Sequence, residues 1–149
     1  MGRRMSRETA MKLLYQMEIR RETSKASIEL MIEETGLTGN DKEYVSFILN
    51  GVAENLVNID QMIEKYLKGW KINRLSKVDL SILRLAVFEI FNADDIPVNV
   101  SINEAVEIAK KYSTDESASF INGVLSKLCE ASNVQHGSEE KLEKDTDGN

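Results

Sequence analysis

The sequence contains very few of the residues that form disulfides, metal sites and covalent catalytic pairs. Its 149 residues include one cysteine, Cys129, and one histidine, His136. A single cysteine excludes an intrachain disulfide and fits a reducing compartment, so we expect a cytoplasmic protein. One cysteine and one histidine cannot supply a zinc site or a Cys/His nucleophile pair. A glycine-rich phosphate loop and a GxSxG motif are also missing. We therefore expect no enzyme activity, no cofactor and no metal.

Proline and glycine are scarce as well, with one proline and eight glycines, which favours long regular elements. The alternation of β-branched and aromatic residues that is typical of strands is missing, so we expect an all-α protein. A hydrophobic content of 42% can supply a substantial core. The longest apolar run, residues 82–91, is interrupted by Arg84 and Glu89 and is too short to span a bilayer. We also expect no secretory signal before the first helix.

The formal net charge of −6 is distributed unevenly along the chain. Residues 1–25 contain seven basic and three acidic residues, a positive surplus at the N-terminus. Residues 136–149 contain five acidic and two basic residues and almost nothing apolar. This composition predicts a disordered acidic tail, which we place at residues 134–149.

The N-terminal segment predicts a helix with one buried face. Its apolar residues recur at the i, i+3, i+4 and i+7 spacing of one helix face: Ala10, Leu13, Leu14 and Met17. We expect Ser6 to be the N-cap, with Arg3 and Arg4 before the helix and Arg7 in its first turn. The helix dipole slightly disfavours a cation there, so the arginine cluster favours a functional interpretation. The alternative is a frayed basic terminus that only keeps the chain soluble.

Two further helical segments complete a predicted N-terminal bundle over residues 1–68. The first is expected to stop before Gly36. The second follows a loop and continues to residue 67, and Gly51, Asn55 and Asn58 are candidates for a bend in it. Whether this stretch is one helix or two stays open. A small bundle is the simplest way to bury three apolar faces together.

A second bundle is predicted over residues 69–133. Ser76 and Asp79 have the spacing of a capping box, and so do Ser101 and Glu104, so we expect a helix to begin at each serine. The helix after the first box is hydrophobic on nearly all sides, which predicts a central position.

Arg84 lies on this hydrophobic helix, where an unpaired charge would be very costly to bury. It must therefore reach an edge of the protein, a carboxylate or a bound anion. A turn at residues 114–119 is expected to lead into the last helix of the chain.

Three segments of the sequence resemble the NusB family of transcription antitermination factors. In the family's order and approximate spacing, they are RRMSRETAMKLLYQ, LSKVDLSILRLAVFEI and DIPVNVSINEAVEIAKKYSTDESASFINGVL. The last is the most specific, because its IP, INEA and F-x-NG-x-L elements occur together. The resemblance covers residues 3–130 and implies an all-helical fold of two small packed bundles with six or seven helices.

The resemblance also implies a function. It implies binding of the boxA element of nascent RNA together with the small-subunit ribosomal protein that doubles as NusE. Other Nus factors and RNA polymerase would be engaged indirectly, and the result would be readthrough of ribosomal RNA operons. Some members of the family pair with themselves, which leaves a homodimer open. The implied RNA contacts are Arg3, Arg4, Arg7, Tyr15, Arg84, Tyr112, Glu116 and Phe120. The positions that resemble the partner-facing ones are Tyr66 and Asp79.

These residue types suit unpaired RNA, since cations bind phosphates and aromatic rings stack on splayed bases. Glu116 is an exception, and it can only accept a hydrogen bond from a base edge or restrain affinity. Tyr15 and Phe120 have a structural alternative as core residues. A helical adaptor that binds only protein is the alternative function. A third possibility, an enzyme domain, arises because the same fold begins certain ribosomal RNA cytosine methyltransferases. We do not expect it, because the sequence shows no catalytic constellation.

Overall fold

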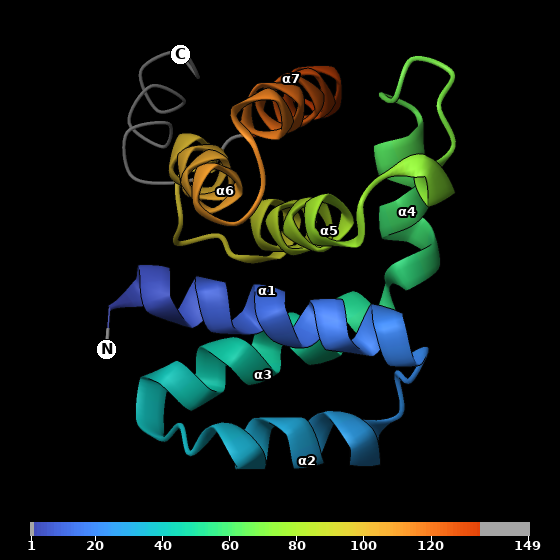
Figure 1. The fold of residues 1–149 in the computed structure, drawn as a ribbon. Coiled ribbons are helices and arrows are strands. Elements are labelled where there is room, and N and C mark those ends of the chain that lie inside the picture. The colour runs from blue at the N-terminus through green and yellow to red at the C-terminus, as the bar shows by residue number, and fades with distance from the viewer. Residues whose placement is uncertain (1, 135–149) are drawn as a thin grey trace.

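The computed structural model describes residues 2–134, which form seven α-helices, one short 3₁₀ helix and no strand (Figure 1). This confirms the predicted all-α class. The predicted acidic tail lies outside the described residues, apart from Val134. In chain order the elements are α1 (Arg3–Arg20), α2 (Lys25–Thr35), α3 (Gly39–Glu54), α4 (Leu56–Glu64), η1 (Ile72–Arg74), α5 (Lys77–Asn92), α6 (Val98–Tyr112) and α7 (Asp115–Ser132).

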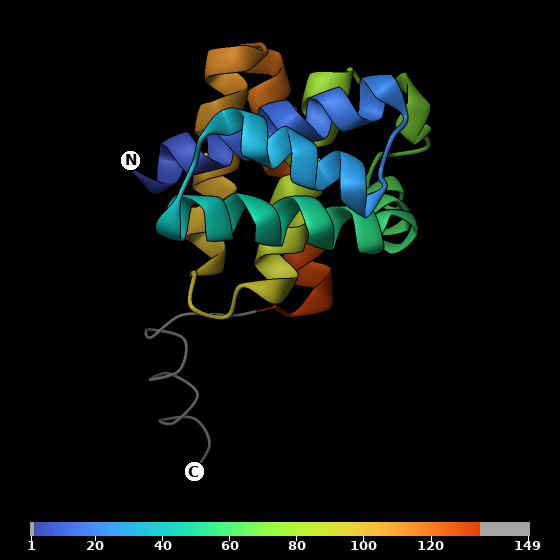
Figure 2. The same ribbon diagram turned by 90° about the horizontal axis from the view of Figure 1, so that it is seen from below.

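The helices form two layers whose axes cross, with α1, α2 and α3 in one layer and α5, α6 and α7 in the other (Figure 2). α1 lies at the junction and packs on both α3 and α5. α4 packs mainly on α5 and also touches α3 and α7, so one core runs through both layers. The division into bundles at residues 1–68 and 69–133 stays a prediction. No helix within residues 2–134 is both long enough and apolar enough to cross a membrane.

α5 occupies the central position that its sequence predicts, because it contacts α1, α3, α4, α6 and α7. Its start at the predicted cap is confirmed: the Ser76 hydroxyl accepts a 3.1 Å hydrogen bond from the Asp79 amide. Close approach of α3 to α5 depends on Gly51, because a Cβ atom there would lie 1.9 Å from Cζ of Phe88.

The predicted cap of the first helix is wrong. α1 begins at Arg3, with Gly2 as its N-cap, so Arg3 and Arg4 lie inside the helix. Ser6 is fully buried, and its hydroxyl donates a 2.9 Å hydrogen bond to Asp41 at the start of α3. A contact between two helices therefore uses the hydroxyl that the local pattern assigned to a cap.

The second predicted capping box is wrong for the same physical reason. α6 begins at Val98, with Pro97 as its N-cap, one turn before the predicted start. The Ser101 hydroxyl donates a 2.7 Å hydrogen bond to Glu89 of α5, while Glu104 accepts from Arg4 of α1. Both members of the predicted box thus bind other helices.

The remaining boundaries depend on short-range contacts. The long predicted stretch is two helices that break at Asn55, whose side-chain amide donates to the carbonyl of Gly51. The predicted end before Gly36 is confirmed, and this glycine adopts the left-handed conformation with φ 73°. The predicted turn at residues 114–119 is too long, because α7 begins at Asp115 with Thr114 as its N-cap.

Candidate functional site

A buried polar cluster joins α1, α3, α5 and α6 around the carboxylate of Glu89, which is 1% exposed. Glu89 accepts hydrogen bonds from Arg7 Nε at 3.1 Å, from the Tyr44 hydroxyl at 2.5 Å and from the Ser101 hydroxyl at 2.7 Å. Burial raises the pKa of Tyr44, and the neighbouring Glu89 charge raises it further, so the phenol stays a hydrogen-bond donor. The Arg7 guanidinium is thus occupied within the protein.

Arg3 and Arg4 lie at the exposed start of α1, and both contact other helices. Nε and Nη2 of Arg4 donate to the two oxygens of Glu104 at 2.9 and 2.6 Å. This hydrogen bond holds the pKa of Glu104 below its ordinary value, although partial burial opposes the shift. The Arg3 guanidinium lies 4.3 Å from the centroid of the Tyr44 ring, in cation–π geometry. This end of the chain is therefore held by α3 and α6.

Arg84 is 7% exposed. Of the three partners that its hydrophobic helix left open, an edge, a carboxylate or an anion, it has carboxylates. Its Nε and Nη2 donate to Asp60 of α4 at 2.8 and 2.7 Å, and its Nη1 donates to Glu18 of α1 at 2.6 Å. Burial lowers the pKa of Arg84, but the hydrogen bonds to the two carboxylates outweigh burial and raise it overall. Arg84 therefore connects α1, α4 and α5 from inside the protein.

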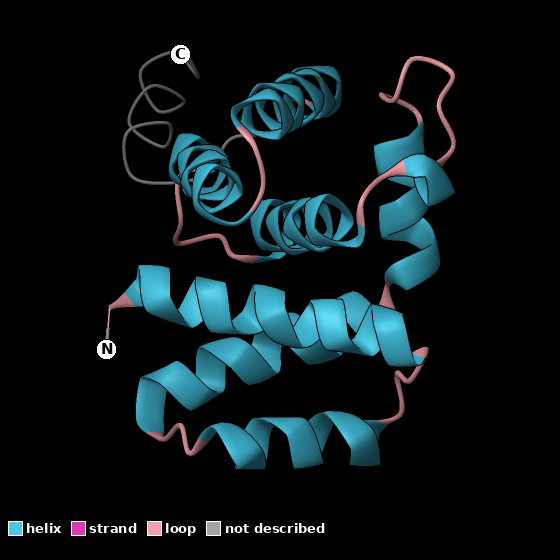
Figure 3. Ribbon diagram, in the orientation of Figure 1, coloured by secondary structure: helices cyan, strands magenta, loops and turns pink. Residues whose placement is uncertain are grey.

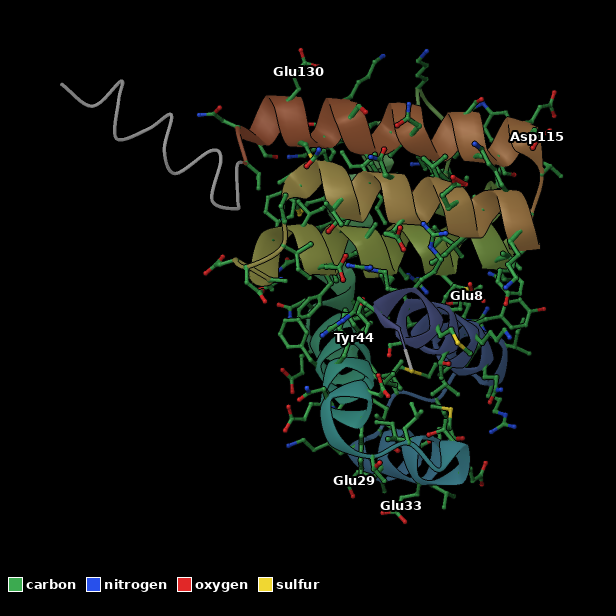
Figure 4. The ribbon with its side chains drawn as sticks, turned by 90° about the vertical axis from the view of Figure 1, so that its left-hand side faces the viewer. Glu8, Glu29, Glu33, Tyr44, Asp115 and Glu130 are labelled. Atoms are coloured by element: carbon green, nitrogen blue, oxygen red, sulfur yellow. The ribbon has the colours of Figure 1, made fainter. Side chains whose placement is uncertain are left out.

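Cations and a tyrosine ring gather around Glu8 of α1, which Figure 4 labels, and the end of α6. The Tyr112 hydroxyl and Lys111 Nζ both donate to Glu8 Oε1, at 2.6 and 2.9 Å. Burial alone would raise the pKa of Glu8, but these hydrogen bonds lower it overall. The ammonium groups of Lys12 and Lys111 lie 5.1 and 5.3 Å from the Tyr112 ring centroid. Tyr15, nearly one turn beyond Lys12, is 37% exposed.

A hollow of about 580 Å³ brings four of the predicted site residues together: Tyr66, Asp79, Glu116 and Phe120. Its walls are the α4–α5 connection, the start of α5 and α7. Asp79 is 8% exposed, and its Oδ2 accepts a 2.7 Å hydrogen bond from the Ser117 hydroxyl. Its Oδ1 has no hydrogen-bond partner within residues 2–134. Asp79 thus has one carboxylate oxygen hydrogen-bonded and the other buried without a partner among the described residues.

The structure thus separates the predicted site residues by exposure. Arg7 and Arg84 are buried in ion pairs, whereas Arg3, Arg4 and Glu116 are exposed. The ring of Tyr15 is exposed and that of Phe120 is half-buried against the core, so neither is sealed inside. In the described part of the chain, no group of acidic, histidine and cysteine side chains could hold a metal ion.

Sequence reasoning missed four functional candidates beside these residues, namely Glu8, Lys12, Glu104 and Lys111. Lys12 carried a usable signal, because it stands three residues before Tyr15 on one helix face. The ion pair of Glu8 with Lys111 carried none, because the two residues lie 103 positions apart.

Comparison with known proteins identifies the family. The model of the NusB family matches residues 4–130. A transcription antitermination protein NusB from Ruminiclostridium cellulolyticum is 55% identical over 128 residues, covering 86% of this chain and 88% of that protein. A transcription antitermination protein NusB from Clostridium novyi is 47% identical over 133 residues, covering 88% of this chain and all of that protein.

Solved structures agree with the sequence matches. The structure of T. maritima NusB is 39% identical with a TM-score of 0.81, covering 96% of this chain and 98% of that one. A structure of the antitermination factors NusB and NusE in complex with double-stranded RNA contains a chain that is 30% identical, with a TM-score of 0.76. That match covers 87% of this chain and 96% of the other. On the evidence of its sequence and its fold, the chain belongs to the NusB family.

Proposed function

We propose that this protein acts in transcription antitermination by holding boxA-type single-stranded RNA together with a small-subunit ribosomal protein, NusE. The observation that carries the proposal is a basic and aromatic surface along α1 and α6, which is exposed except at the half-buried Tyr112. We call it the α1–α6 surface, and its residues are Arg3, Arg4, Lys12, Tyr15, Lys111 and Tyr112. Curated relatives that are named as antitermination proteins support this role. The solved complex of NusB and NusE with double-stranded RNA supports binding of RNA and of NusE.

The groups on the α1–α6 surface match the two chemistries of RNA binding. Arg4 uses Nε and Nη2 for Glu104, which leaves Nη1 to donate to a phosphate. Lys12 and Lys111 surround the Tyr112 ring and add positive charge beside it. The exposed ring of Tyr15 can stack on a splayed base. Binding by such a surface needs no catalytic group.

Arg7 and Arg84 are excluded from direct RNA contact in this proposal, because both are buried against carboxylates. Arg7 has a positioning role instead. Its Nη1 lies 3.6 Å from Glu104, the residue that binds Arg4, so Arg7 helps to fix the carboxylate that orients the exposed arginine.

In this proposal, the ribosomal partner binds at the hollow. Tyr66 and Asp79 both line it, as does Ser117, whose hydroxyl donates to Asp79. Glu116 and Phe120 line the same hollow. In this proposal, the RNA contacts of α7 therefore lie next to the partner contacts. Other Nus factors and RNA polymerase would be reached through this complex. A homodimer that covers the same surface would compete with RNA.

Salt-dependent binding of a boxA-like RNA tests this function. We expect Arg3→Ala with Arg4→Ala to weaken binding and to lower the slope of log K against log salt by about 1.4, since each lost phosphate contact on a single strand contributes about 0.7. The matched control replaces two exposed arginines at the other end of α1, Arg20 and Arg21, with alanine. We expect this control to change neither quantity. If both double variants change RNA affinity and salt slope equally, or if neither changes them, the alternative of an adaptor that binds only protein is favoured.

A further inference from the structure

The first turns of α1 and α3 lie side by side and bring Arg3 over the ring of Tyr44. Both helices begin on the left of Figure 3, α1 at Arg3 and α3 at Gly39. The Ser6 hydroxyl donates to Asp41 and joins the two turns. Cζ of Arg3 lies 4.3 Å from the centroid of the Tyr44 ring, within the range of a cation–π contact. An exposed cation of α1 is therefore supported by a ring of α3.

The contact with the ring leaves the hydrogen-bond donors of Arg3 available. The Arg3 side chain makes no hydrogen bond and no ion pair within residues 2–134. A guanidinium that stacks on an aromatic face uses none of its N–H donors for that contact. Arg4, by contrast, uses two of its nitrogens to bind Glu104. Arg3 therefore has more donors to offer a phosphate than Arg4 has.

The Tyr44 ring is itself fixed by the core of the protein. Tyr44 is 5% exposed, and its hydroxyl donates a 2.5 Å hydrogen bond to Oε2 of Glu89. Glu89 is 1% exposed and also accepts from Arg7 and Ser101, so the acceptor of the phenol is held in place by other helices. The ring therefore gives Arg3 a support that does not depend on bound RNA.

Such a support matters because an arginine side chain has many rotamers. Without it, an exposed arginine in the first turn of a helix must lose this freedom when it binds a phosphate, and the loss of entropy weakens binding. The Tyr44 ring restricts Arg3 before any ligand arrives. Contact with the ring thus lowers the entropic cost of a phosphate contact.

We propose that Tyr44 is a positioning residue for RNA binding, whose ring holds the Arg3 guanidinium ready to bind a phosphate. Tyr44 does not contact RNA in this proposal and acts only through Arg3. The inference rests on the proposed function, in which Arg3 is an RNA contact. A cation–π contact at an exposed site can account for a change of about two- to fivefold in affinity, so the effect is measurable.

A double-mutant cycle tests the proposal on the full-length protein with a boxA-like RNA. We expect Tyr44→Leu to weaken binding about two- to fivefold and to lower the slope of log K against log salt by about 0.7, the contribution of one phosphate contact. In the Arg3→Ala background, Tyr44→Leu should change neither quantity further. Equal effects of Tyr44→Leu in both backgrounds would show a purely structural role and overturn the proposal. Tighter binding by Tyr44→Leu would overturn it too, because the ring would then compete with the phosphate for Arg3.

Two variants separate the ring from the buried hydrogen bonds. Tyr44→Phe keeps the ring but removes a donor to Glu89, so it should lower the free energy of unfolding and retain most of the RNA affinity. Ser101→Ala removes another donor to the same carboxylate and leaves the ring in place, so it should act in the same way. If either variant weakens RNA binding as much as Tyr44→Leu does, the loss comes from the cluster around Glu89 and the proposal is wrong.

Arg3→Lys tests the same contact without changing the core. Lysine keeps the charge but lacks the planar guanidinium that stacks on a ring, so RNA binding should weaken although the charge is unchanged. If Arg3→Lys binds RNA as tightly as the unaltered protein, charge alone is sufficient and Tyr44 has no positioning role. If Arg3→Ala leaves RNA affinity and salt slope unchanged, the RNA contact of Arg3 in the proposed function fails. A loss with Arg3→Ala that Tyr44→Leu does not reproduce refutes only the role of Tyr44.

Discussion

Replacing Arg7 with methionine is expected to destabilise the fold strongly, because it removes the cation that neutralises a buried carboxylate. Glu89 is 1% exposed and would keep two of its three donors, the hydroxyls of Tyr44 and Ser101. Breaking a buried ion pair from one side costs about 3–5 kcal/mol, and the two remaining donors place Arg7→Met near the lower end of this range. That is a large share of the stability of a typical domain. Urea unfolding followed by far-ultraviolet circular dichroism measures the loss.

Two companion variants identify the cause of this loss. Arg4→Met removes an arginine whose side chain is 56% exposed, so it should cost far less stability than Arg7→Met. Arg7→Met combined with Glu89→Gln removes the uncompensated charge and should recover much of the stability. The reasoning is refuted if Arg7→Met is as stable as Arg4→Met, or if the double variant recovers nothing.

Three further predictions concern stability, and urea unfolding measures all of them. Gly51→Ala should lower the free energy of unfolding by about 1–3 kcal/mol, because the Phe88 ring must move to admit the new Cβ atom. This loss should exceed the gain from the higher helix propensity of alanine. An unchanged stability would show that α3 and α5 can separate freely. Ser76→Ala should cost about 1 kcal/mol through the lost N-cap, whereas no loss would mean that water replaces the hydroxyl. The lowered pKa values of Glu8 and Glu104 stabilise the folded state above their ordinary value of 4.5, so stability should fall as the pH drops below it. Glu8→Gln should flatten this dependence, and an unchanged pH profile would contradict the assignment.

Local sequence signals predicted most of the helices, because apolar spacing and caps act over a few residues. The buried face of α1, the glycine that ends α2 and the serine cap of α5 were all identified in this way. The signals failed at Ser6 and Ser101, whose hydroxyls bind residues on other helices instead of capping their own. A capping pattern states what a side chain can do locally, and packing between helices decides whether it does so.

The candidate site was less predictable, since sequence identifies cations but not their partners. The acceptors of Arg7 and Arg84 lie 82 and 24 positions away along the chain, so neither partner had a local signal. For Arg84, the hydrophobic helix indicated only that the charge must reach an edge, a carboxylate or an anion. The sequence pattern does not distinguish Arg3 and Arg4 from Arg7. Their exposure differs because they lie at different places on α1 relative to α5 and α6. Trp70 illustrates the converse, because a tryptophan normally predicts burial and the connection between α4 and α5 leaves it 56% exposed.

Mapping the amide chemical shifts of the full-length protein by NMR during titration with boxA-like RNA tests the central claim most directly. The account predicts that the largest changes occur at the start of α1, in the C-terminal half of α6 and around the hollow at Phe120, with α2 unaffected on the far side of the molecule (Figure 1). Changes concentrated on α2, or none at a saturating RNA concentration, would contradict it.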